Sequence, residues 1–148
     1  MIARRRILLA DDHALVRAGI RALLESLPRV VVVGETGDGL EAVELVRRDP
    51  PDAILLDITL PGLNGLEAAA RIARLDVPTR VLMLSMHASA EYAARALAAG
   101  ASGYLNKDSA FDELATALDE VCAGRRYLCR ALDVEAVRQF ERRAGSGE

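Results

Sequence analysis

The segment AILLD, Ala53 to Asp57, decides the fold, because four apolar residues run without interruption up to a single carboxylate. A strand that is apolar at every position is buried on both faces, as in a parallel sheet covered by helices. Similar short runs, apolar except for Arg80, occupy residues 7–10, 30–33 and 80–84. We therefore expect these segments to be neighbouring strands of one parallel sheet.

Apolar residues at helical spacing follow each of these strands. The expected helices cover residues 15–27, from 40 to the Pro50-Pro51 pair, from 65 to about 75, 90–99 and 111–123, and a short fifth strand lies at 103–105. Alternating strands and helices predict an α/β fold, a five-stranded parallel sheet with helices on both faces. The connections should be short and right-handed. Ligands bind such sheets at the carboxyl ends of the strands.

Polar residues with complementary chemistry follow the predicted strands. Asp11 and Asp12 follow the first strand, Asp57 the third, Ser85 the fourth and Lys107 the fifth. If the fold is as expected, these side chains converge on one edge of the sheet. Clustered carboxylates repel one another and need a cation. Mg²⁺ is the natural choice, because it prefers oxygen ligands and keeps some positions for water or phosphate.

The residue types at this edge predict phosphoryl chemistry. Asp57 can act as a nucleophile and form an acyl phosphate. The ammonium of Lys107 can pair with a phosphoryl oxygen, and the hydroxyl of Ser85 can donate a hydrogen bond to another. Taken singly, an aspartate after a strand is often only a helix cap, and a lone lysine or serine is usually a solvated or turn residue. Their joint placement on successive strand ends favours the functional interpretation.

Four segments carry a resemblance to a known family: ILLADDHALVRAGI (Ile7–Ile20), AILLDITLPGLNGLEA (Ala53–Ala68), VLMLSMHA (Val81–Ala88) and GASGYLNKD (Gly100–Asp108). Through them the chain resembles a response-regulator receiver domain of two-component signalling over about residues 5–124, and its details look most like the NarL/FixJ subfamily. This resemblance implies a flavodoxin-like (βα)₅ fold with strand order 2-1-3-4-5.

The resemblance assigns roles to the acidic residues. Asp57 would accept a phosphoryl group from a sensor histidine kinase. Asp11 and Asp12 would be the acidic pair, the second being the usual direct Mg²⁺ ligand, and the backbone carbonyl of Thr59 a further ligand beside Asp57 itself. The domain would catalyse only its own phosphorylation and dephosphorylation, so it is not expected to be an enzyme in the ordinary sense.

The resemblance also implies a switch. Ser85 would be the switch hydroxyl and Lys107 the lysine of the site, while Tyr104 would turn inward when Ser85 moves toward the phosphate. Thr59 and His87 occupy positions that, in the family, tune the loss of the phosphoryl group. The regulated surface would comprise the helix after Ser85, the fifth strand and the last regular helix. Dimerisation through this surface, or through the first and last helices, is a further expectation.

The chain divides into an expected receiver domain at residues 1–124 and a C-terminal linker at 125–148. The linker should hold a short helix capped by Asp133 and a flexible segment Gly145-Ser146-Gly147. The subfamily resemblance implies a transcription factor whose LuxR-type helix-turn-helix domain lies outside this chain, so DNA would be bound only through that domain. Two alternatives stay open, a stand-alone receiver acting by protein contact or phosphorelay, and an interaction module that is not phosphorylated.

Composition excludes other classes of function. The chain has 148 residues, 51% of them hydrophobic and 28% charged, with a net charge of −3, so no basic face for nucleic acid is expected. No stretch approaches the ~18 apolar residues of a membrane span, and the start does not have the form of a signal peptide. Cys122 and Cys129 match neither a zinc nor a redox motif. Phe111 and Cys122 should both lie on the apolar face of the last regular helix, which faces the core. These features fit a cytoplasmic location.

Several weaker signals are rejected. The glycines of residues 34–39 stand in the order GxxGxG, which differs from the dinucleotide motif GxGxxG. Thr59 occupies the position where a haloacid-dehalogenase-type phosphatase needs a second aspartate, and no phosphate loop of the flavodoxin type follows the first strand. His13 is interpreted as a helix-start residue, and its spacing from His87 argues against a zinc site.

Overall fold

The strands form at the apolar runs and pair in a single sheet. The computed structural model describes residues 4–145, and in this part of the chain all strand pairs are parallel, in the order β2-β1-β3-β4-β5-β6. The predicted order 2-1-3-4-5 is therefore confirmed and extended by one strand. The strands are β1 (Arg5–Ala10), β2 (Val30–Thr36), β3 (Ala53–Asp57), β4 (Arg80–Ser85), β5 (Gly103–Asn106) and β6 (Tyr127–Leu128).

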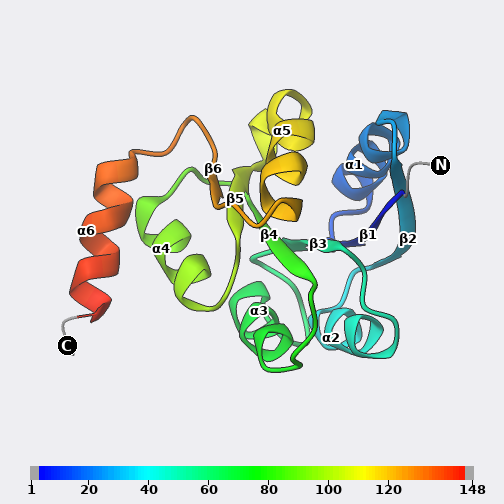
Figure 1. Ribbon diagram of the computed structural model, residues 1–148, viewed down its shortest axis with the longest axis horizontal. Coiled ribbons are helices and arrows are strands. Elements are labelled where there is room, and N and C mark those ends of the chain that lie inside the picture. Colours follow the sequence, from blue (N-terminus) through cyan, green and yellow to red (C-terminus); the bar gives the residue numbers. More distant parts are fainter. Residues whose placement is uncertain (1–3, 146–148) are drawn as a thin grey trace.

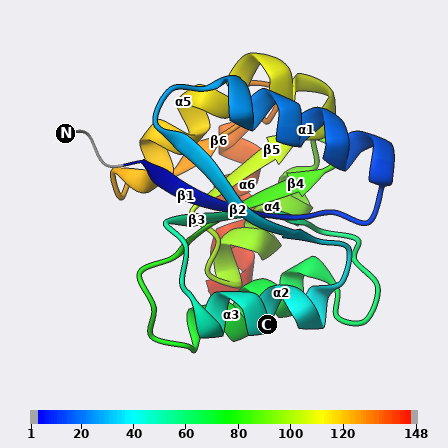
Figure 2. The ribbon, with the colours of Figure 1, turned by 90° about the vertical axis from the view of Figure 1, so that its right-hand side faces the viewer.

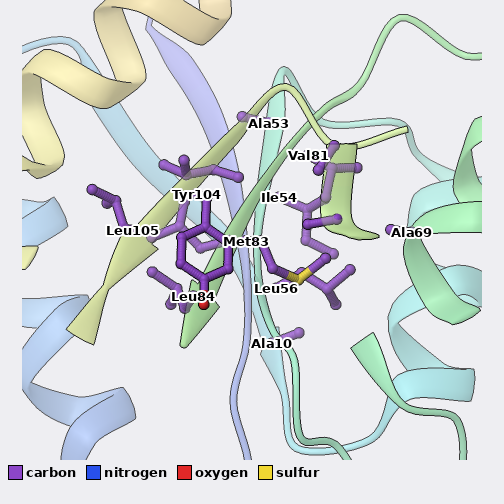
Figure 3. Packing of buried hydrophobic residues seen from close by; sticks show 14 of the residues in the cluster. Ala10, Ala53, Ile54, Leu56, Ala69, Val81, Met83, Leu84, Tyr104 and Leu105 are labelled. Carbon is purple, nitrogen blue, oxygen red and sulfur yellow. The ribbon is translucent and has the colours of Figure 1, made fainter. Parts of the chain in front are cut away.

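Helices cover both faces of the sheet, as the unbroken apolar strands require. In Figures 1 and 2, α1 and α5 lie on one face, and α2, α3 and α4 lie on the other. Figure 3 shows the buried side chains of β3, β4 and β5 packed between these layers. The helices are α1 (Ala14–Ser26), α2 (Gly39–Arg48), α3 (Gly65–Ala73), α4 (Ala90–Ala98), α5 (Ala110–Cys122) and α6 (Val134–Gly145), with a short 3₁₀ turn, η1 (Lys107–Ser109), before α5.

The sixth strand was not predicted. Gly124, with φ of +85°, turns the chain after α5, and Tyr127-Leu128 then pairs with β5. Gly103 permits this approach, because a Cβ at that position would lie 2.9 Å from the carbonyl oxygen of Tyr127 and 2.8 Å from Leu82 Cδ1. The sheet therefore has six strands where the sequence pattern indicated five.

The C-terminal helix α6 packs against α4 at the edge of the domain (Figure 1). The carboxylate of Asp133 accepts hydrogen bonds from the backbone N–H groups of Glu135 and Ala136, which confirms the predicted cap. Val137 is buried in the shared core. Of the segment expected to be flexible, Gly145 ends α6, and Ser146 and Gly147 lie outside the described residues. The division of the chain at residue 124 stays a prediction.

Phe111 departs from its predicted place on the apolar face of the last regular helix. Its side chain is 62% exposed, because it lies at the start of α5 and reaches over α1. The ring lies close to Gly19 of α1, because a Cβ added to that glycine would be 3.6 Å from Phe111 Cζ. Cys122, by contrast, is half-buried against the core as expected, and both cysteines are free thiols.

None of the helices found in residues 4–145 has both the length and the apolar character needed to cross a membrane.

Candidate functional site

The parallel sheet brings the predicted site residues to one edge. Asp57 is the last residue of β3, and Asp11 follows β1, whose residue Ala10 lies beside Leu56. Ser85 ends β4 and Lys107 follows β5. The strand ends therefore meet as predicted, with carboxylates at the ends of β1 and β3 and the hydroxyl and the ammonium at the ends of β4 and β5.

Lys107 links two buried carboxylates. Its Nζ lies 3.0 Å from Asp57 Oδ2 and 2.8 Å from Asp11 Oδ2. All three side chains are at most 3% exposed. Lys107 is also the only lysine in the chain. One ammonium therefore faces two buried negative charges, and the site has an excess of negative charge before Asp12 is considered.

Asp11 has an oxygen that points to a missing ligand. Its Oδ2 is buried and accepts no hydrogen bond from any described residue, although Lys107 Nζ is nearby. The contact with Lys107 is therefore an electrostatic one without hydrogen-bond alignment. Asp12, whose side chain is 37% exposed, closes the cluster on the solvent side. A divalent cation with oxygen ligands fits this donor set, because it would satisfy the free oxygen and offset the excess charge.

The loop after β3 holds the Asp57 carboxylate from the other side. Thr59 donates to Asp57 Oδ1 through its backbone N–H, at 3.1 Å, and through its hydroxyl, at 3.3 Å. Gly65 allows the loop to close, because a Cβ there would lie 2.1 Å from the carbonyl oxygen of Asp57. Burial raises the pKa of Asp57, while the Lys107 ammonium and the Thr59 N–H oppose that rise. The carboxylate is thus fixed in place by donors on both of its oxygens.

Ser85 and Tyr104 are connected through His87 in the loop between β4 and α4. The Ser85 hydroxyl oxygen accepts from the His87 backbone N–H at 3.1 Å. The Tyr104 hydroxyl donates to the His87 carbonyl oxygen at 2.7 Å, and its side chain is fully buried (Figure 3). Burial raises the pKa of Tyr104. Tyr104 is therefore buried while Ser85 is bonded to the His87 N–H, and the role of both residues as a switch stays a prediction.

His13 is the residue of this site that the sequence analysis set aside. It is the N-cap of α1, as expected for a helix-start residue. Its Nδ1 nevertheless lies 3.2 Å from Asp11 Oδ1 and 3.3 Å from Asp12 Oδ1. The signal in the sequence was its position directly after the acidic pair, where a turn into a helix can fold the ring back over the strand end. Asp11, Asp12, His13 and Asp57 each offer an atom to a cluster no more than 4.8 Å across.

The geometry agrees with comparisons with known proteins. Residues 7–119 match the response regulator receiver domain family. The chain is 43% identical over 122 residues to the response regulator UvrY of Escherichia coli (strain K12), covering 82% of this chain and 56% of UvrY. It is 39% identical over 126 residues to the nitrate/nitrite response regulator protein NarL of the same strain, covering 85% of this chain and 58% of NarL.

Solved structures show the same fold. A two-component response regulator of the LuxR family from Aurantimonas sp. SI85-9A1 has a TM-score of 0.83 and 38% identity, over 97% of this chain and 99% of that one. The signal receiver domain of the putative response regulator NarL from Mycobacterium tuberculosis has a TM-score of 0.80 and 39% identity, over 84% of this chain and 100% of that one.

The chain spans about half the length of the curated relatives it matches. The family match covers most of the chain, and it includes the strand ends at which the acidic residues and the lysine meet. The chain therefore belongs to the response regulator receiver domain family, with NarL-type and LuxR-type regulators among its relatives.

Proposed function

We propose that Asp57 accepts a phosphoryl group from a sensor histidine kinase and that the modified domain changes its binding surface. The observation that carries the proposal is the buried pair of Asp57 and Lys107 beside the free oxygen of Asp11. A carboxylate fixed by donors on both oxygens, with an ammonium in contact, is suited to act as a nucleophile toward phosphorus. A merely structural ion pair between Lys107 and Asp57 would not explain a second buried carboxylate, Asp11, whose Oδ2 contacts the same ammonium without a hydrogen bond.

The acidic residues would hold Mg²⁺. Asp11, Asp12 and Asp57 would supply carboxylate oxygens, and Thr59 its backbone carbonyl. When bound, Mg²⁺ would neutralise charge between the carboxylate and the incoming phosphoryl group. The half-exposed Asp12 lies where a cation would enter from solvent, and the buried Asp11 would bind the cation on the side of the protein core.

In the transfer step the Asp57 carboxylate is the nucleophile. A carboxylate oxygen attacks the phosphorus, the new O–P bond forms, and the bond from phosphorus to the leaving group breaks. The leaving group is the imidazole nitrogen of the kinase phosphohistidine, or acetate when acetyl phosphate is the donor. Lys107 then pairs with a phosphoryl oxygen instead of the carboxylate oxygen. Attack by water on phosphorus later releases inorganic phosphate and restores Asp57.

The switch would act through His87. Phosphorylation adds negative charge and acceptor oxygens, which draw the Ser85 hydroxyl away from the His87 N–H. Because the His87 carbonyl is held by Tyr104, a movement of Ser85 is transmitted to the loop that starts α4. The surface built from α4, β5 and α5 would then shift between two populations. A full reversal of those populations needs about 5.5 kcal/mol of differential interaction.

We propose that the output belongs to a domain outside this chain. We infer that a LuxR-type helix-turn-helix domain follows, because the match covers only 56% of UvrY and 58% of NarL and a similar solved structure is of the LuxR family. The whole protein would then control transcription in the cytoplasm, with DNA bound through that domain, and phosphorylation would favour a homodimer. The sequence of the full-length gene decides between this output and a stand-alone receiver.

The test is the intact mass of the chain after incubation with acetyl phosphate and Mg²⁺. We expect a labile gain of about 80 Da, one phosphoryl group on the aspartate nucleophile. The gain should vanish in Asp57→Asn and in EDTA. Asp12→Asn should slow it, because the carboxylate nearest solvent is lost. A gain that persists in Asp57→Asn would show that another residue is the acceptor and would refute the assignment. No gain from acetyl phosphate or from a purified sensor kinase would favour the interaction module.

A further inference from the structure

The imidazole of His13 lies within the carboxylate cluster. The backbone N–H of His13 donates to Asp11 Oδ1 at 2.8 Å, and this turn directs the ring over the strand ends. Its Nδ1 lies 3.2 Å from an oxygen of Asp11, 3.3 Å from Asp12 and 3.7 Å from Asp57. One nitrogen is therefore close to all three carboxylates that the proposed function assigns to a cation.

The distances between His13 Nδ1 and the carboxylate oxygens match the distances between ligand atoms bound to a single metal ion. Ligands bound at about 2.0–2.2 Å lie about 3 Å apart when adjacent and about 4 Å apart when opposite. The distances from Nδ1 to the three carboxylates fall in this range, and the four ligand atoms lie within 4.8 Å of one another. The buried oxygen of Asp11 without a hydrogen-bond donor independently indicates that a ligand is missing here.

Protonation of His13 on Nε2 would leave a lone pair on Nδ1. That lone pair could accept from Lys107 Nζ, which lies 3.4 Å away and also donates to Asp57 Oδ2 at 3.0 Å. The same lone pair is what a metal ion needs. The ring is half-exposed, so an ion can reach it from solvent without displacing the core.

We propose that His13 Nδ1 is a metal ligand, so that this site favours divalent transition-metal ions such as Ni²⁺ over Mg²⁺. The proposal rests on the proposed cation site and specifies its ligand set. Carboxylates and carbonyls alone suit Mg²⁺, whereas an imidazole nitrogen suits the first-row transition metals. A mixed set of carboxylates and one imidazole therefore changes which cation occupies the site when both are present.

The experiment is isothermal titration calorimetry of the untagged 148-residue chain with NiCl₂ and, separately, MgCl₂. The main variant is His13→Asn, because asparagine is as good a helix N-cap as any residue and removes only the imidazole. His87→Asn is the matched control for histidine outside the cluster. Asp57→Asn removes a carboxylate that both ions would share. Circular dichroism checks that each variant is folded.

We expect His13→Asn to weaken Ni²⁺ binding at least about tenfold, the lower limit seen when even an indirect partner of a metal ligand is removed. Mg²⁺ binding should stay almost unchanged, His87→Asn should change neither, and Asp57→Asn should weaken both. Unchanged Ni²⁺ affinity in His13→Asn, or an equal loss for both ions, would overturn the proposal. If acetyl phosphate fails to modify Asp57 while His13→Asn loses Ni²⁺ selectively, the proposed function is wrong and the ligand assignment stands.

Discussion

Replacing Lys107 with methionine should destabilise the metal-free domain by about 3 kcal/mol. Methionine keeps the apolar stem of the side chain and removes the ammonium that contacts both Asp11 and Asp57. The two buried carboxylates then face each other across no more than 4.8 Å. With an effective dielectric constant of about 20, two like charges at that distance repel by about 3 kcal/mol. Removal of one partner from a buried pair typically costs about 3–5 kcal/mol, which agrees with this value.

A bound divalent cation and a lower pH should each reduce this loss of stability. A bound divalent ion supplies the missing positive charge, so the difference between variant and wild type should shrink in Mg²⁺. Burial raises the pKa of Asp57, and Lys107 opposes that rise, so the variant should have a still higher pKa for Asp57. A folded-state pKa above the unfolded one means that the folded protein binds more protons in that window. The stability of the variant should therefore recover as the pH falls through the raised pKa.

The assay is urea unfolding followed by far-UV circular dichroism, in EDTA and in saturating Mg²⁺. Arg130→Met is the matched control, because Arg130 is a 74% exposed cation lying 3.6 Å from the buried carboxylate of Glu113. The Arg130 guanidinium is solvated, and Glu113 keeps its donors from the Tyr127 hydroxyl and the Arg130 backbone N–H, so this control should lower the stability by at most about 1 kcal/mol. Equal stability of Lys107→Met and wild type in EDTA would refute the charge balance described above. An equally large loss in Arg130→Met would show that the cost is not specific to the site.

Three further predictions concern groups outside the acidic cluster. Burial, together with the hydrogen bond to Glu113, raises the pKa of Tyr127 to about 12 from 10.0. The stability that depends on the neutral phenol is therefore complete below pH 10 and is lost toward pH 12. Tyr127→Phe should flatten the profile of stability against alkaline pH, and an unchanged profile would contradict this prediction. Gly103→Ala should lower the stability by about 1–3 kcal/mol and release β6, because the alanine Cβ would lie 2.8–2.9 Å from neighbouring atoms. Amide exchange at Tyr127 that is no faster in the variant than in wild type would argue against this prediction. Tyr104→Phe should cost about 1 kcal/mol in urea unfolding, because the His87 carbonyl loses its donor; a variant as stable as wild type would mean that water replaces the hydroxyl.

The sheet could be predicted from sequence because its central strands carry no ambiguity. The run Ala53–Leu56 is buried at every position, as an apolar strand between two helical layers must be. β6 could not be predicted, since two residues form no periodic pattern and their pairing depends on the missing side chain of Gly103. The prediction that Phe111 faces the core was wrong, because helical spacing gives the direction of a side chain but not how far the core extends beneath the helix.

The candidate site could be predicted to the level of which residues meet. That prediction follows from topology alone, because the carboxyl ends of parallel strands share an edge. What topology does not give is the burial of each group and the direction of its atoms. The free oxygen of Asp11, the return of His13 over the acidic pair and the inward position of Tyr104 all depend on side-chain packing. Sequence spacing contains no information on these features.

The choice of lysine at position 107 is itself informative in this chain. Every other basic side chain apart from the histidines is arginine, so the composition favours guanidinium wherever a surface charge suffices. A guanidinium binds a carboxylate with a planar fork, which would lock Asp57 or Asp11 and fill the space between them. An ammonium is compact and can contact both carboxylates at once, as Lys107 does at 3.0 and 2.8 Å. It can also exchange a carboxylate oxygen for a phosphoryl oxygen by rotation of its stem. The single lysine is therefore at the position where the proposed function needs a movable point charge, and we expect an arginine there to fill the space that the proposed cation would occupy.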